Sequence, residues 1–138
     1  IDEAIERLTT MGYLDDRVFA EFWVKERNAS KPLGTRALRY ELRQKGIAGT
    51  MIDDVLDDHD ETATAVEAAR RHLRRVRGLT RSEARKKLTA QLARKGFSPS
   101  TTRESIQQIF EEVDAGDEPF FREDTEGKDA DRDWTEDR

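Results

Sequence analysis

Two near-copies of one phrase, Leu42-Arg-Gln-Lys-Gly-Ile47 and Leu92-Ala-Arg-Lys-Gly-Phe97, lie fifty residues apart in the sequence. The same shift places Leu38 on Leu88. Each phrase ends in a glycine followed by a large apolar residue, which is typical of a helix that closes on glycine at its C′ position. A repeat of this length predicts a small structural unit that buries its apolar face against a neighbouring copy.

The segments around these phrases carry apolar residues at helical spacing, and none alternates well enough to predict a strand. We therefore expect an all-α fold in which tandem three-helix modules stack into an elongated, curved rod. The expected helices lie near residues 2–11, 16–29, 35–45, 51–58, 62–77, 81–95 and 99–113.

Glycines and polar residues mark the expected helix ends. Four glycines are expected to close helices at C′: Gly12, Gly46, Gly78 and Gly96. Three polar residues are expected to begin helices as N-caps: Asp15, Thr80 in a capping box with Glu83, and Ser98 before Pro99.

The repeat divides the chain into four parts. Residues 1–13 are interpreted as the last helix of a truncated first module, 14–60 as a second three-helix module and 61–113 as a third, basic module. From residue 114 the helical pattern ends, and residues 114–138 are expected to form an acidic, flexible tail that keeps the chain soluble. The alternative is that this acidic segment lies over the basic surface and competes with an anionic ligand.

Charge is distributed unevenly along the chain, although the net charge is only −5. Residues 61–113 carry a net charge of +6 and residues 114–138 a net charge of −7. Between Arg70 and Lys95 there are eleven basic residues and a single acid, Glu83. Because like charges three or four residues apart destabilise a helix, this stretch predicts an anionic partner rather than an ordinary mixed surface.

Eight basic residues on the expected helices are the candidates for binding that partner. Three form a stripe on the helix 35–45, and five lie on the two basic helices of the third module. They are Arg36, Arg39, Arg43, Arg70, Arg74, Arg85, Lys86 and Arg94. The alternative interpretation is a solvated face, with charges near helix C-termini that only complement the helix dipoles.

Other residue patterns argue against an enzyme, a metal site or a cofactor. The sequence contains no cysteine, and His59 and His72 are isolated from other candidate ligands. The aromatic stripe Phe19, Phe22 and Trp23 is interpreted as core rather than as a base-stacking surface. No apolar run is long enough to span a membrane, so we expect a cytoplasmic protein, and a monomer.

The chain resembles the RecX family, the bacterial regulators of the RecA recombinase. The resemblance rests first on Gly12-Tyr13-Leu14-Asp15-Asp16-Arg17-Val18-Phe19-Ala20. Gly34 leading into Leu38…Glu41-Leu42…Lys45-Gly46-Ile47, and Leu92…Lys95-Gly96-Phe97-Ser98, extend it. These phrases occur in order over residues 1 to about 113, and the acidic tail is not part of them.

The resemblance implies a curved stack of three-helix modules that lies in the groove of the RecA–DNA filament and lowers RecA's ATPase and strand-exchange activities. Contact with single- or double-stranded DNA is left open. One alternative is a direct nucleic-acid binder in which a module acts like a helix-turn-helix. Against it, helix 81–95 offers few of the polar residues that a recognition helix uses. A purely structural helical adaptor would leave the basic bias unexplained.

Overall fold

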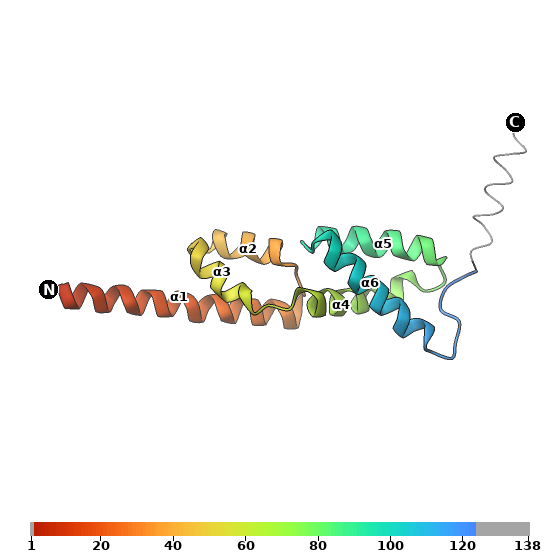
Figure 1. Ribbon diagram of the computed structural model, residues 1–138, viewed down its shortest axis with the longest axis horizontal. Helices are drawn as coiled ribbons and strands as arrows, with labels where there is room; N and C mark the ends of the chain where they lie inside the picture. Colours follow the sequence, from red (N-terminus) through yellow and green to blue (C-terminus); the bar gives the residue numbers. More distant parts are fainter. Residues whose placement is uncertain (1, 124–138) are drawn as a thin grey trace, which may run out of the picture.

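The computed structural model describes residues 2–123, which form an elongated, entirely helical molecule (Figure 1). In chain order the helices are α1 (Asp2–Ser30), α2 (Thr35–Gln44), α3 (Gly49–Asp57), α4 (Glu61–His72), the short 3-10 helix η1 (Leu73–Val76), α5 (Arg81–Arg94) and α6 (Pro99–Asp114). The expectation of an all-α fold is confirmed. Across residues 2–123 no strand forms, and an isolated bridge joins Thr80 to Arg122.

The two modules follow one another along the long axis of the molecule. Helices α1 and α4 run nearly end to end along one side, and α2 and α5 run end to end along the other (Figure 1). The core of the second module lies between α1, α2 and α3, and includes Ala20, Leu38, Leu42, Ile52 and Leu56. The core of the third lies between α4, α5 and α6, and includes Ala69, Leu88, Leu92, Ile109 and Phe110.

Most of the expected helix ends are confirmed. The glycines that need a left-handed backbone have it, with φ of 84° at Gly46, 82° at Gly78 and 90° at Gly96. Helix α5 begins with the expected capping box, in which Thr80 Oγ1 accepts from the Glu83 amide and Glu83 accepts from the Thr80 amide. Ser98 caps α6, and Pro99 occupies its first turn.

The expected break at Gly12 is wrong, because α1 continues through it from Asp2 to Ser30. Gly12 has no positive φ, so it does not close a helix, and Asp15 lies inside α1 rather than at an N-cap. A single glycine costs a helix only about 1 kcal/mol relative to alanine, which is less than breaking the run of hydrogen bonds. The division at residue 13 stays a prediction, and it falls within one helix.

The aromatic stripe of α1 is only partly core. Trp23 is half-buried, and its Nε1 donates to Glu41 at 2.9 Å. Phe19 is 37% exposed and Phe22 is 59% exposed, so the interpretation of these two as core is wrong. Helices α2 and α3 cover the face of α1 that carries the fully buried Ala20, and the phenylalanines lie outside that contact.

The expectation of a flexible tail beginning at residue 114 is wrong for its first part. After α6 the chain turns back, and Phe120 and Phe121 pack against the core of the third module. The Gly78 amide donates to the Phe120 carbonyl at 3.0 Å, and the Arg122 amide donates to the Leu79 carbonyl at 2.8 Å. Two aromatic side chains supply enough apolar burial to order this short segment. The rest of the expected tail, from residue 124, lies outside the described residues.

Candidate binding surface

The two modules meet through their main chains at a joint formed by Gly34 and Gly96. The Gly34 amide donates to the Lys95 carbonyl at 2.8 Å. A Cβ atom on Gly34 would lie 2.2 Å from the carbonyl carbon and oxygen of Gly96, and one on Gly96 would lie 2.7 Å from Cβ of Ala37. Because both contacts are closer than side chains tolerate, these glycines set how the modules sit on one another.

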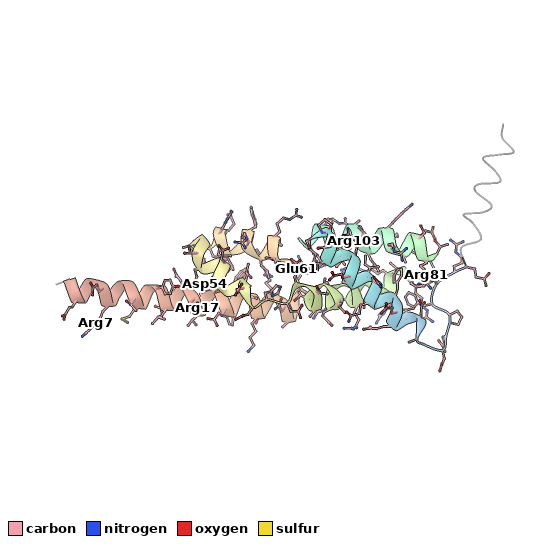
Figure 2. All side chains as sticks on the ribbon, in the orientation of Figure 1. Arg7, Arg17, Asp54, Glu61, Arg81 and Arg103 are labelled. Atoms are coloured by element: carbon pink, nitrogen blue, oxygen red, sulfur yellow. The ribbon has the colours of Figure 1, made fainter. Side chains whose placement is uncertain are left out.

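Glu61, at the start of α4, lies where the two modules meet (Figure 2). Its carboxylate accepts from the Thr35 amide at 2.8 Å and from Ser98 Oγ at 3.2 Å. Burial tends to raise the pKa of Glu61, but the hydrogen bonds from Thr35, Thr101 and Ser98 outweigh it and lower that pKa. The ionised carboxylate therefore holds α2 and the α6 N-terminus together.

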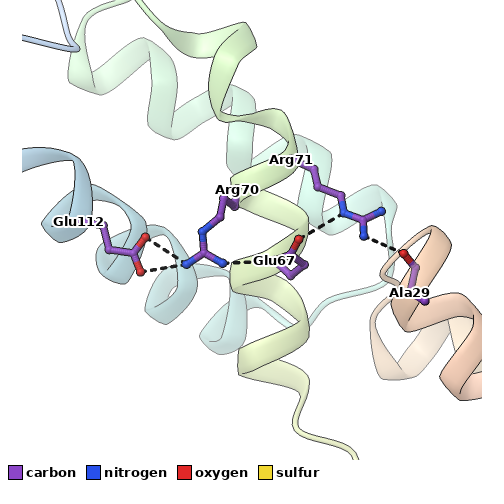
Figure 3. Close-up of polar contacts among 5 residues, drawn as sticks. All are labelled: Ala29, Glu67, Arg70, Arg71 and Glu112. Carbon is purple, nitrogen blue, oxygen red and sulfur yellow. Dashed lines mark hydrogen bonds and ion pairs between the residues drawn. The ribbon is translucent and has the colours of Figure 1, made fainter. Parts of the chain in front are cut away.

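Arginines complete the joint. Arg36 donates to the Ala93 carbonyl at 3.1 Å. Arg71 donates to the carbonyls of Ala29 and Ser30 at the end of α1, each at 2.8 Å, and its contact with Ala29 is drawn in Figure 3. Arg71 thus satisfies carbonyls at the C-terminus of α1, and Arg36 adds a second hydrogen bond to the Ala93 carbonyl, which also accepts from the Gly96 amide.

The predicted stripe on α2 is only partly available to a partner. Arg36 is used at the joint, and Arg39 forms an ion pair with Asp53 of α3. Arg43 is exposed and forms no ion pair with a described residue. The stripe lies outside the core as expected, but two of its three arginines already have partners within the chain.

Arg70, predicted as a binding residue, is neutralised within the third module. It donates to Glu67 at 3.1 Å and to both carboxylate oxygens of Glu112, at 3.0 and 3.1 Å (Figure 3). The hydrogen bond that Arg70 donates to Glu112 is the main reason that the pKa of Arg70 is raised. The guanidinium of Arg85 lies 5.1 Å from the centre of the Phe110 ring. Both side chains thus face α6.

The other predicted residues of the third module are open. Arg74 and Lys86 are exposed and form no ion pair within residues 2–123. Arg94 is also exposed and donates to the Gln91 side chain at 3.2 Å, with no acidic partner among the described residues. Of the eight predicted residues, only Arg39 and Arg70 form ion pairs with acids among the described residues. Arg36 and Arg85 contact a carbonyl and an aromatic ring, and the remaining four are the most open to a partner: Arg43, Arg74, Lys86 and Arg94.

The structure adds a cationic cluster around His72 that the sequence did not single out, which we call the joint cluster. It consists of Lys31, Arg71, Arg75, Arg94 and Lys95. Burial is the main reason that the pKa values of His72 and Lys95 are lowered, and neighbouring cations lower both further. These are Lys95, Arg75 and Arg94 around His72, and Lys31, Arg71 and Arg75 around Lys95. The cluster concentrates positive charge where the two modules meet.

A cavity of about 280 Å³ opens beside this cluster, between η1 and α5. Its polar lining includes His72, Arg75, Lys87, Gln91 and Arg94. The four-residue spacing of Arg71 and Arg75 could have indicated this site from the sequence. Lys31 could not, because it follows α1 of the second module and comes near Lys95 only when the two modules pack together. The arrangement suits binding of an anionic group, because a charge-assisted contact there would offset repulsion among the cations.

Two other classes of site find no support in the described part of the chain. Within residues 2–123, no group of three histidine, aspartate or glutamate side chains is placed to hold a metal ion. None of the described helices combines the length and apolar character that crossing a membrane requires. The basic surfaces of the two modules therefore remain the candidate functional feature.

Known proteins share this sequence and architecture. Residues 15–56 match a family model described as RecX, second three-helix domain, and residues 59–106 match one described as RecX, third three-helix domain. "Regulatory protein RecX" of Chlorobium phaeobacteroides is 46% identical over 110 residues, covering 80% of this chain and 72% of that protein. The protein of the same name from Streptomyces coelicolor is 37% identical over 114 residues, covering 80% of this chain and 61% of that protein.

A solved structure, "Crystal structure of regulatory protein RecX", superimposes with a TM-score of 0.61 at 28% identity. The similarity covers 78% of this chain and 55% of that one, so the chain spans little more than half of the solved protein. The two modules thus match, in chain order, two consecutive three-helix domains of one family. This chain belongs to the RecX family.

Proposed function

We propose that this chain regulates the RecA recombinase by docking on the RecA–DNA filament, and that docking lowers RecA's ATPase and strand-exchange activities. The observation that carries the proposal is the joint cluster of cations around His72 and its cavity. Arg71 pairs with Glu67 at 3.4 Å, but the other four cations form no ion pair with an acid among residues 2–123. It supports a partner with an anionic surface, and the family assignment makes the RecA filament the first candidate.

The binding face we propose differs from the eight residues predicted from charge alone. It keeps the open residues Arg43, Arg74, Lys86 and Arg94 and adds Lys31, Arg75 and Lys95. Arg36, Arg39, Arg70 and Arg85 are given a lesser part, because each already contacts a group within the chain. Charges without internal partners can form new ion pairs without first breaking old ones, so they contribute most to a complex.

A pair of double variants tests this proposal. Arg74→Gln/Arg94→Gln removes two open charges, and Arg70→Gln/Arg81→Gln removes two paired ones, so both variants change the net charge equally. The assay is RecA ATPase activity on single-stranded DNA, titrated with each form of the chain. We expect the first variant to weaken inhibition by about tenfold or more, and the second by clearly less.

Unfolding measurements serve as the control for this comparison. The paired variant should lose stability, because Glu112 and Asp114 lose their arginine partners, whereas the open variant should unfold like the parent chain. Equal loss of inhibition by both variants would show that only net charge matters. An ATPase rate that the parent chain leaves unchanged would refute the proposed function itself.

Direct sequence-specific binding of duplex DNA is the second candidate, and the cationic surface of α5 is the observation that favours it. Two of the polar side chains that could read bases are already occupied, however. Thr80 caps α5, and Gln91 contacts both His72 and Arg94. Binding to naked duplex DNA that discriminates between sequences without RecA would favour this candidate over the first.

A further inference from the structure

The segment 115–123, which follows α6, lies along the turn between η1 and α5, and we call it the strap. Two main-chain hydrogen bonds hold it, from the Gly78 amide to the Phe120 carbonyl at 3.0 Å and from the Arg122 amide to the Leu79 carbonyl at 2.8 Å. The Arg122 side chain adds an ion pair of 3.0 Å with Glu83. The strap is thus fixed mainly at its C-terminal end.

The strap and the end of α6 contact two arginines of the basic stretch, Arg77 and Arg81, whose side chains stay 59% and 43% exposed. The guanidinium of Arg81 lies 4.8 Å from the centre of the Phe121 ring and pairs with both carboxylate oxygens of Asp114, at 2.8 and 3.2 Å. The guanidinium of Arg77 lies 5.7 Å from the Phe120 ring and 3.7 Å from the Glu118 carboxylate. These arginines therefore face aromatic rings and carboxylates of the same chain instead of a partner.

Aromatic packing anchors the strap on the third module. The Phe121 ring packs against Phe110 of α6 with centroids 4.7 Å apart, and Phe120 meets Phe121 edge-on at 5.0 Å. Both strap rings are only partly buried. Such contacts are strong enough to order a short segment, but few enough to open without unfolding the module.

A cavity of about 390 Å³ lies between the strap and the end of α6. Arg81, Asp114, Asp117, Glu118 and Phe120 are among its lining residues. The middle of the strap therefore bridges open space instead of packing on the module, and the Glu118 side chain is 86% exposed. A segment held at its ends over a cavity can be displaced at small cost in lost contacts.

From these contacts we infer that the strap is an autoinhibitory element, which withholds Arg77 and Arg81 from the phosphate groups of single-stranded DNA. When the strap is displaced, Arg77 loses its ring and its carboxylate. Arg81 loses the Phe121 ring and keeps its exposed pair with Asp114 and its contact with the Phe110 ring, 5.5 Å away. Phosphates compete readily with a pair of that kind, because exposed ion pairs contribute little net stability. The inference rests on the proposed function only in assuming an anionic ligand for the third module.

The test measures binding of a fluorescently labelled single-stranded oligonucleotide to the full chain, without RecA, over a range of salt concentrations. The variant Phe120→Ala/Phe121→Ala releases the strap and keeps every charge. Each phosphate contact on a single strand adds about 0.7 to the slope of log K against log salt. One or two regained contacts should steepen the slope by about 0.7 to 1.4 and tighten binding about five- to twenty-five-fold near 0.1 M salt.

Two further variants make the result specific. Phe22→Ala removes an exposed aromatic side chain from α1 and should leave the slope unchanged. Arg77→Gln/Arg81→Gln, combined with the released strap, should abolish the gain, because the double-mutant cycle isolates the contribution of these two arginines. A gain that survives without both arginines would overturn the inference, as would unchanged affinity after release.

Hydrogen exchange verifies that the strap has opened. The Gly78 amide, which donates to Phe120, should exchange faster in the released variant, while amides of α6 stay protected. If the double variant fails to fold, Phe120→Ser alone gives the same comparison, because Phe120 lies over Arg77 and farther from Phe110 than Phe121 does. Absence of oligonucleotide binding by both forms also overturns the inference.

The outcomes separate this inference from the proposed function. An ATPase rate that the chain leaves unchanged, together with tighter oligonucleotide binding after strap release, would refute regulation of RecA and keep the strap inference. If the chain inhibits RecA but the salt slope stays unchanged after strap release, the strap inference is refuted and regulation of RecA is kept.

Discussion

Replacing Gly34 by alanine tests whether the two modules are joined by direct main-chain contact. The new Cβ would lie 2.2 Å from the carbonyl carbon and oxygen of Gly96 and 2.4 Å from the Phe97 nitrogen. All three are main-chain atoms, so no side-chain rotation relieves the clash. Helix α2 must therefore move away from the turn at Gly96, and the hydrogen bond from Gly34 to Lys95 is lost.

The expected cost follows from three contributions. Overpacking costs about 1 to 3 kcal/mol, and the lost main-chain hydrogen bond about 0.5 to 1.5 kcal/mol. Because Gly34 has a φ of −74°, alanine fits its backbone and regains about 0.4 to 1 kcal/mol by restricting the unfolded chain. We therefore expect Gly34→Ala to lower the free energy of unfolding by about 0.5 to 4 kcal/mol.

Urea unfolding followed by circular dichroism is the assay, with small-angle X-ray scattering to follow the shape of the folded molecule. Gly12→Ala is the matched control, since a Cβ there meets nothing within 4 Å and Gly12 lies inside α1. It should raise helix stability by at most about 1 kcal/mol. A Gly34→Ala chain with the parent's unfolding midpoint and the parent's scattering curve would refute the argument that this contact sets the joint.

Three further predictions concern single contacts. The hydrogen bonds that lower the pKa of Glu61 stabilise the folded chain above the unfolded value of 4.5, and this contribution is lost as pH falls through the folded pKa. The difference in unfolding midpoint between the parent and Glu61→Gln should therefore shrink in acid, and a constant difference would contradict it. Thr80→Ala should cost about 1 kcal/mol of stability in thermal unfolding, while Thr89→Ala on the exposed face of α5 should be nearly neutral. Lys95→Gln should raise the pKa of His72 in an NMR titration, since Lys95 is among the cations that lower it, and an unchanged pKa would argue against the joint cluster.

The repeat made the fold predictable, because each copy carries its own helix-ending glycine and its own apolar face. Gly46 and Gly96 both adopt the left-handed backbone that the repeated phrase predicts. Gly12 precedes a large apolar residue in the same way, yet it lies in mid-helix. Local sequence could not separate these cases, since a glycine closes a helix only where the chain then folds back onto a packed neighbour.

The binding face was less predictable than the fold. Charge counting identified the third module but not which of its arginines are paired. Glu112 and Asp114, which pair with Arg70 and Arg81, lie on α6, more than thirty residues away in the sequence. Lys31 reaches the joint cluster only through the arrangement of the modules. The sequence left open that the acidic tail lies over the basic surface, but it did not predict that Phe120 and Phe121 anchor this segment. These two phenylalanines stand among acidic residues and show no helical period.

Gly34 and Thr80 occupy corresponding places, as the N-cap residues of α2 and α5, and they limit how the modules can stack. Gly34 leaves room for the main chain of the third module at Lys95 and Gly96. This contact joins two different surfaces, so it is of the head-to-tail type that can in principle repeat. At Thr80 the side chain closes its own helix, and the strap already uses the neighbouring main-chain groups of Gly78 and Leu79. The strap thus covers the main chain next to the start of α5, whereas at the start of α2 the corresponding main chain contacts the neighbouring module.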